Sequence, residues 1–153
     1  EVPDDAFSDC SGLETIEIEG PVNSIGNYAF SGCSVLKSIA IPESVTCIGI
    51  AAFCDCRSLM SFAISSSITV IQSCTFQNCV KLSKIELPNF VESIEDAAFY
   101  GCKALELISI PKSVIKIGEE VFGGCTNLEV VVVPEDHKYH PNAFPSNITI
   151  LPY

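Results

Sequence analysis

The protein has 153 residues, of which 19 are acidic and 8 basic, so its net charge at pH 7 is −11. Nucleic-acid binding through phosphates requires clustered Lys and Arg, which the sequence lacks, and the negative charge disfavours an anionic membrane surface. No apolar run is long enough to cross a bilayer, and the length favours a single domain. The charge indicates a solvated acidic surface, which would also favour a basic patch on a protein partner.

A repeat of 23 residues runs through the chain. Phenylalanine occurs at Phe7, Phe30, Phe53, Phe76, Phe99 and Phe122. Three residues after each comes a cysteine (Cys10, Cys33, Cys56, Cys79, Cys102, Cys125), and three further on a leucine (Leu13, Leu36, Leu59, Leu82, Leu105, Leu128). A fixed period of this length predicts a solenoid, in which each coil buries its apolar side chains against its neighbours.

Each repeat predicts three elements in order. The first is a strand with alternating, mostly β-branched apolar residues, at 16–18, 39–41, 62–64, 85–87, 108–110 and 131–133. Proline follows at positions 42, 88, 111 and 134 and ends the strand, since it cannot donate to a ladder. A second short extended piece, Val-x-x-Ile, then turns at Gly26, Gly49 or Gly118. Ala-Phe-x-x-Cys is too short for a stable helix and is expected to form a turn or a single helical turn.

The motif Cys-x-x-Leu-x-x-Ile-x-Ile-Pro-x-Ser-Val-x-x-Ile-Gly-x-x-Ala-Phe resembles the BspA-like leucine-rich repeat, also called the Treponema pallidum type. The resemblance covers residues 1–134. Departures from the motif include Gln72 and Glu95, which replace the glycine, Ser65, which replaces the proline, and Thr75 and Val121, which replace the alanine. The resemblance implies a β-rich α/β solenoid, a right-handed leucine-rich-repeat superhelix shaped as a horseshoe, with the first strands on its parallel concave sheet.

The two ends of the chain differ in their repeat pattern. We expect residues 1–134 to form about six coils, and residues 135–153, which keep Ala-Phe and Ile-x-Ile but lose Cys and Leu, to form a degenerate C-terminal cap. Glu1 falls in the middle of a repeat, so we interpret the chain as a fragment or mature form of a longer protein. An uncapped N-terminal coil would permit end-to-end self-association.

Outward-facing strand residues are the candidate binding site. If Ile39 and Ile41 point inward, Ser38 and Ala40 point outward on the concave sheet. Propagating this offset gives a protein-binding face of Thr15, Glu17, Ser38, Ala40, Ser61, Ala63, Lys84, Glu86, Leu107, Ser109, Val130 and Val132. Two interpretations of its apolar end stand: Leu107, Val130 and Val132 are a protein contact, or the cap covers them with Tyr139 or Phe144.

The nine cysteines favour packing over chemistry. Six form a column between a core Phe and a core Leu, where a free thiol serves as a small apolar side chain. Three lie off the column, at Cys47, Cys54 and Cys74, and a Cys54–Cys74 disulfide between neighbouring coils is an alternative to free thiols.

The sequence offers no catalytic, cofactor or metal site. Both histidines, His137 and His140, fall in the last coil, where a polar loop is a better interpretation than a zinc site. Paired carboxylates such as Asp4-Asp5, Glu95-Asp96 and Glu119-Glu120 fall at turns rather than in a pocket. Asn147-Ile-Thr149 is a glycosylation sequon that matters only on a eukaryotic secretory route.

We therefore expect a protein-binding repeat domain and not an enzyme. The family resemblance implies a cell-surface or secreted protein that adheres to host or extracellular-matrix proteins through the concave face. The alternative is a structural or scaffold repeat region of a larger protein, with no ligand of its own.

Overall fold

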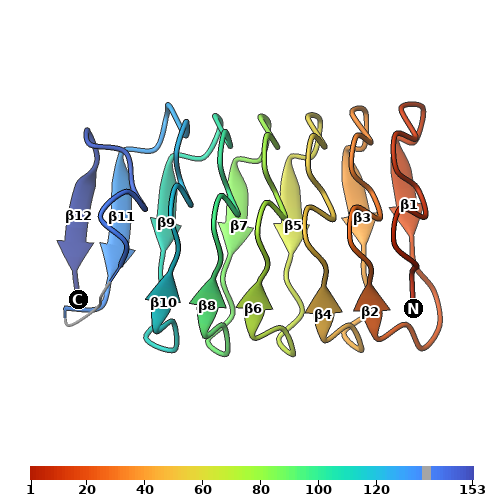
Figure 1. Ribbon diagram of the computed structural model, residues 1–153, viewed down its shortest axis with the longest axis horizontal. Coiled ribbons are helices and arrows are strands. Elements are labelled where there is room, and N and C mark those ends of the chain that lie inside the picture. The colour runs from red at the N-terminus through yellow and green to blue at the C-terminus, as the bar shows by residue number, and fades with distance from the viewer. Residues whose placement is uncertain (136–138) are drawn as a thin grey trace.

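The computed structural model describes residues 1–135 and 139–153, which form a solenoid of parallel coils standing side by side in chain order (Figure 1). One ladder, here the β1 ladder, holds β1 (Thr15–Glu17), β3 (Ser38–Ala40), β5 (Ser61–Ala63), β7 (Lys84–Glu86), β9 (Leu107–Ser109), β11 (Val130–Val133) and β12 (Thr149–Pro152). The other, the β2 ladder, holds β2 (Ser24–Ile25), β4 (Cys47–Ile48), β6 (Val70–Ile71), β8 (Ser93–Ile94) and β10 (Lys116–Ile117). The arrows of the two ladders point in opposite directions because each coil passes up one wall and down the other.

The 23-residue period sets the register of the strands. Ile16 pairs with Ile39 and Ile71 with Ile94, all in parallel pairs, so each side chain stands beside its equivalent in the next coil. The β1 ladder is divided into three sheets, β1–β3, β5–β7 and β9–β11–β12, and the β2 ladder into β2–β4 and β6–β8–β10. Identical columns and the parallel arrangement follow directly from the repeat.

The Ala-Phe-x-x-Cys segment forms a third line of hydrogen bonds between coils. The N–H groups of Tyr28, Phe30 and Gly32 donate to carbonyls of the next coil at 2.9, 2.8 and 2.8 Å. Two residues of each segment have left-handed backbone angles, with φ of 55° at Tyr28 and 74° at Gly32, and the same two offsets recur in the other coils. Left-handed residues at these two offsets are incompatible with a right-handed helical turn. Of the two structures predicted for this segment, the turn is therefore correct and the single helical turn is wrong. Among the described residues there is no helix, and hence none that could span a membrane.

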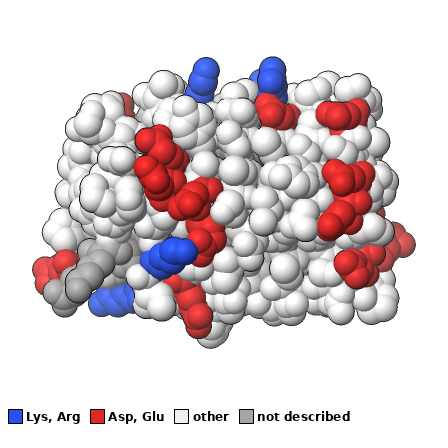
Figure 2. Space-filling model, in the orientation of Figure 1, with Lys and Arg blue, Asp and Glu red and all other residues white. Residues whose placement is uncertain are grey.

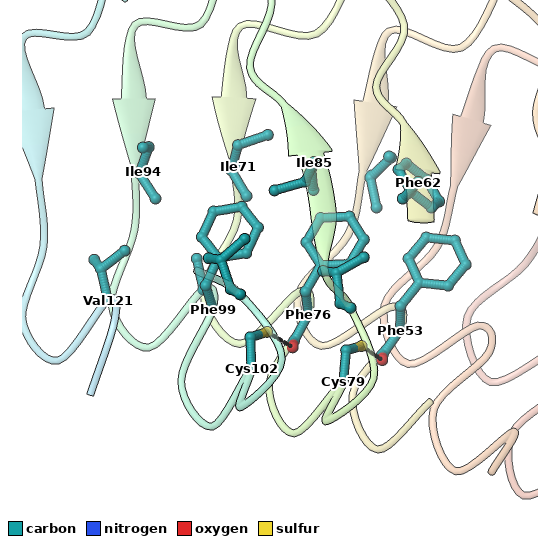
Figure 3. Close-up of a cluster of buried hydrophobic side chains, with 14 of the residues drawn as sticks. Phe53, Phe62, Ile71, Phe76, Cys79, Ile85, Ile94, Phe99, Cys102 and Val121 are labelled. Carbon is teal, nitrogen blue, oxygen red and sulfur yellow. Dashed lines mark hydrogen bonds between the residues drawn. The ribbon is translucent and has the colours of Figure 1, made fainter. Parts of the chain in front are cut away.

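The interior is built around a stack of phenylalanine rings. From Phe7 to Phe144 the rings lie nearly parallel, and neighbouring centroids are 5.1–5.7 Å apart. Phe62 leans against two members of the stack, with its centroid 4.9 Å from those of Phe53 and Phe76 (Figure 3). Offset stacking of this kind adds to the large apolar area that each ring removes from water.

The cysteine column also makes a regular set of hydrogen bonds. The Sγ atoms of Cys33, Cys56, Cys79, Cys102 and Cys125 each donate to the carbonyl of the Phe 26 residues earlier, at 3.1–3.2 Å. Figure 3 shows two of these bonds, from Cys79 to Phe53 and from Cys102 to Phe76. The predicted column of free thiols is confirmed for these five, which are 0–2% exposed, whereas Cys10 at the N-terminal end is exposed. Each thiol therefore gives a second donor to a buried carbonyl that one backbone N–H already contacts.

The Ile-Gly glycines are needed because the preceding coil lies too close for a side chain. A Cβ atom on Gly49 would lie 2.6 Å from Asn27 N and 2.7 Å from Gly26 C. Asn27 causes the close approach, since its Oδ1 accepts the N–H of Ile50 at 2.9 Å. Asp4 does the same before Gly26, and Asp96 before Gly118.

The two departures from glycine follow the same rule. Gln72 and Glu95 follow coils that carry Ile50 and Ser73 at the position held by Asp4, Asn27 and Asp96 in the coils that precede a glycine. Without an Asp or Asn side chain to bind the next backbone, the position accepts a Cβ atom. The repeat pattern predicts a turn at these glycines, but their role is close packing between coils, and φ at Gly49 is not left-handed.

Replacing Gly49 with alanine is expected to destabilise the protein by about 1–3 kcal/mol, because the new methyl group meets immovable backbone. Gln72→Ala, at the same offset one coil later, is the matched control and should cost less than about 1 kcal/mol. Urea denaturation measures both. In an Asn27→Ala background the cost of Gly49→Ala should shrink, and an unchanged cost in that double-mutant cycle would show that Asn27 does not set the spacing.

Candidate protein-binding face

The outward side chains of the β1 ladder form one continuous surface, here the ladder face. All twelve predicted residues lie on it in registered positions, from Thr15 and Glu17 on β1 to Val130 and Val132 on β11. Those on β1 to β9 are exposed, and the two valines are half-buried. The alternation of the strands explains this, since the residue between each outward pair points into the core.

Chemistry changes along the ladder face because the outward residues do not repeat. The N-terminal coil is acidic at Glu17, the next two coils present Ser and Ala, and Lys84 and Glu86 follow. Three hollows of about 410, 370 and 520 Å³ lie over β1–β3, β5–β7 and β7–β9 respectively. The face is therefore hollowed, and its lining differs from coil to coil.

The C-terminal end of the ladder face is apolar, with exposed leucines on either side of the half-buried Val130 and Val132. Leu107 is 57% exposed and Leu151 46%. Phe144 stacks on Phe122 at 5.5 Å between centroids, and Tyr139 packs edge-on against Phe144 at 4.9 Å. Phe144 therefore does not cover this end, because it extends the interior ring stack, and Tyr139 packs against Phe144.

Three residues of the ladder face are not among the twelve predicted from the sequence. The strand β12 pairs with β11, which places Thr149 beside Val130 and Leu151 beside Val132, and Tyr153 follows. The signal was present in Ile-Thr-Ile, but Ile150 pairs with Val131 at a spacing of 19 rather than 23, so propagating the offset missed it. Tyr153 is fixed in place, since its hydroxyl donates to the carbonyl of Ile110 at 3.0 Å.

On the face shown in Figure 2, the largest groups of acidic side chains lie on either side of a mostly uncharged middle, and further acidic side chains lie along its edges. Turns of the first coil hold the exposed Asp4 and Asp5, and later turns hold Asp96, Glu119 and Glu120. Asp4 and Asp96 accept backbone N–H groups of the next coil, which is a structural use. The paired carboxylates thus lie on exposed turns, except for Glu95, which is half-buried and accepts a hydrogen bond from Lys116 Nζ at 2.6 Å.

The described residues hold no group of three or more His, Cys, Asp or Glu side chains that could bind a metal ion. His137, one of the two histidines considered for metal, lies outside the described residues. All nine cysteines are described and all are free thiols, so the Cys54–Cys74 disulfide is not formed. Burial, followed by the nearby Asp55, raises the pKa of Cys54 to about 12, which leaves it protonated and a poor nucleophile.

A stack of 23-residue parallel coils, with a buried leucine column and one ladder of exposed variable side chains, defines a leucine-rich-repeat solenoid. The family model described as "BspA type Leucine rich repeat region (6 copies)" matches residues 1–129 and again residues 47–150. The chain belongs to this family. The similarity inferred from Ile-Pro, Ile-Gly and Ala-Phe in order is thereby confirmed.

Solved structures of bacterial proteins share the fold. A leucine-rich cell surface protein from Faecalibacterium prausnitzii is 38% identical over 78% of this chain and 32% of its own, with a TM-score of 0.75. The T. pallidum leucine-rich repeat protein is 33% identical over 85% of this chain and 61% of its own, with a TM-score of 0.82. A leucine-rich repeat protein from Bacteroides ovatus is 29% identical over 97% of this chain and 48% of its own, with a TM-score of 0.62.

The chain spans about a third of the first of these proteins, three fifths of the second and half of the third. No curated protein matches the sequence at a significant level. The likeness therefore fixes the family and the fold of this segment.

Proposed function

We propose that the protein is a non-enzymatic binding domain whose ladder face recognises another protein. One observation carries the proposal: this face combines regular spacing with side chains that change from coil to coil, and it ends in the exposed Leu107 and Leu151. Contiguous exposed apolar residues beside polar ones mark interaction surfaces. The hollows over the strands can receive side chains of a partner protein.

We further propose adhesion to host or extracellular-matrix proteins at a cell surface. Support comes from the family and from the F. prausnitzii neighbour, whose description calls it a cell surface protein. The net charge of −11 favours basic partner surfaces, which raises association rates at low ionic strength. A scaffold without a ligand of its own is the competing function.

Substituting Leu107 with aspartate tests the proposal. A buried charge at the centre of a contact is expected to weaken binding to a captured matrix protein by about 30-fold or more. Ile115→Asp is the matched control, because Ile115 is 76% exposed, lies outside the ladder face and should leave binding unchanged. Surface plasmon resonance against a panel of immobilised matrix proteins gives the affinities, and circular dichroism verifies folding.

Equal losses for Leu107→Asp and Ile115→Asp would contradict a binding role for the ladder face. Failure of the unaltered protein to bind any member of the panel at micromolar concentration would contradict adhesion and favour the scaffold function. Val130→Asp and Val132→Asp extend the test, although both side chains are half-buried and also report on packing.

A further inference from the structure

The largest described hollow on the ladder face lies at one of the two divisions of the β1 ladder, between β7 and β9. It measures about 520 Å³ and spans β7 and β9, which belong to different sheets. The neighbouring hollow over β5 and β7 lies within one sheet and is smaller, at about 370 Å³. This division therefore coincides with the largest of the three hollows described on this face.

Two carboxylates line this hollow and one ammonium group opposes them. Glu86 and Glu106 are both exposed, and Lys84 Nζ lies 3.5 Å from Glu86 Oε1. The side chains of that ion pair are 77% and 84% exposed, so solvent screens it and it holds Lys84 only weakly. The lining is therefore left with one uncompensated negative charge, and a cation already approaches Glu86.

An apolar wall stands beside the carboxylates. Leu107 is 57% exposed, and the Tyr153 ring is held in place by its hydroxyl bond to the Ile110 carbonyl. Lys112 Nζ lies over that ring, 5.4 Å from its centre, a position in which a cation is attracted to the aromatic face. Carboxylates next to an aliphatic and an aromatic surface suit a side chain that is apolar along its stem and cationic at its tip.

We propose, resting on the protein-binding function above, that this hollow receives an arginine side chain of the partner protein. Its methylene stem lies on Leu107, its planar guanidinium is offered to Glu86 and Glu106, and Tyr153 supplies a flat surface. Arginine fits better than lysine because a guanidinium is planar, is weakly hydrated and donates in a fork that matches carboxylates. Lys84 is then a competitor, since its ammonium group must leave Glu86 when the guanidinium arrives.

A blocked tripeptide, acetyl-Gly-Arg-Gly-amide, is the probe, with acetyl-Gly-norleucine-Gly-amide as its uncharged match. Nitrogen-15 NMR of the full chain follows the backbone amides during titration. We expect the arginine peptide to shift amides of 84–86, 107–109 and Tyr153 with a Kd on the order of millimolar, and to lose the effect at high salt. The norleucine peptide should shift them at least about fivefold less at equal concentration.

Three variants sharpen the test. Glu106→Gln should weaken binding of the arginine peptide by about two- to fivefold, and Lys84→Gln should strengthen it by about twofold because the competing cation is gone. Glu119→Gln removes the same charge on an exposed turn outside the ladder face and should leave the affinity unchanged. General attraction to the acidic protein would make the affinity for the arginine peptide respond to both Lys84→Gln and Glu119→Gln. Tighter binding by Lys84→Gln with no change in Glu119→Gln would therefore indicate a local effect in the hollow.

Equal shifts from the norleucine peptide, shifts spread over all acidic turns, or weakening by Lys84→Gln would each overturn the arginine site. These outcomes are separable from failure of the proposed function. If Leu107→Asp abolishes capture of a matrix protein while the arginine peptide moves no amide in the hollow, the ladder face binds its partner by other means and only the arginine site is wrong.

Discussion

Phe76→Ala is expected to destabilise the protein by about 3–5 kcal/mol, a large part of the stability of a domain this size. Phe76 is 0% exposed, and its ring stacks on Phe53 and Phe99 with centroids 5.7 and 5.4 Å away. Phe62 contacts it from the side at 4.9 Å. Coils on both sides are fixed by parallel hydrogen bonds, so the cavity left by the ring cannot collapse.

The chain provides a matched control for this substitution. Phe90 is 64% exposed on the loop after β7, and Phe90→Ala should change stability by less than about 0.5 kcal/mol. Urea denaturation followed by circular dichroism compares the two variants. Because repeat arrays are stabilised mainly by contacts between neighbouring coils, a break at the middle of the ring stack should also lower the m-value if the two halves begin to unfold separately. Similar losses for Phe76→Ala and Phe90→Ala would show that the ring stack does not stabilise the array.

Stability is expected to collapse above about pH 9 because the folded protein keeps its buried thiols protonated. Burial is the main cause that raises the pKa of Cys56, Cys79 and Cys102 far above the ordinary value of 9.0. In the unfolded chain these thiols ionise near their ordinary pKa, so above it the unfolded state binds fewer protons than the folded state. The stability contribution is fully present below about pH 9 and is lost as pH rises toward the folded pKa values.

The size of this effect follows from the number of protons. Each retained proton lowers the free energy of unfolding by a little over 1 kcal/mol per pH unit, so three thiols give roughly 4 kcal/mol per unit. Burial also raises the pKa of Cys33 and Cys125 to about 11, which steepens the fall in the same range. Urea denaturation in reducing buffer between about pH 8 and pH 10 measures the slope.

Removing buried thiols should flatten that pH dependence. In the double variant Cys79→Ala with Cys102→Ala, the folded state retains two fewer protons, so the unfolding free energy should fall less steeply with pH. The loss of the hydrogen bonds to Phe53 and Phe76 lowers stability at pH 8 but does not affect this comparison of slopes. Cys47→Ala removes an exposed thiol as the control and should retain the wild-type slope. An unchanged slope in the double variant would mean that these thiols ionise equally in both states.

Periodicity alone was enough to predict the interior of this protein. Equal spacing of Phe, Cys and Leu placed each side chain beside its equivalent, because parallel coils must keep a common register to bury a continuous core. The outward positions followed from strand alternation. The ten predicted outward residues of β1 to β9, from Thr15 to Ser109, are therefore exposed as expected. The function of those positions remains a proposal, since a repeat predicts where variable residues stand and not what they bind.

Features that depend on the spacing between particular coils could not be predicted in this way. The division of the β1 ladder between β7 and β9 leaves no mark on the repeat, although the largest described hollow lies there. The strand β12 pairs with β11 at a spacing of 19 residues, four fewer than the period. The repeat therefore did not predict that Leu151 and Tyr153 lie on the ladder face. Left-handed residues at Tyr28 and Ala51 were missed because neither is a residue type that favours that conformation.

The pairing of Asn27 with Gly49 has a consequence for how such arrays can grow. The two residues lie in different coils, so each junction is encoded by halves of two adjacent repeats rather than within one. A duplicated or grafted coil carrying Asp or Asn at this turn must be followed by one with glycine, whereas a coil carrying Ile50 or Ser73 accepts Gln72 or Glu95. Recombination breakpoints placed between Asn27 and Gly49 would therefore separate a matched pair, and coils should exchange successfully only in compatible combinations.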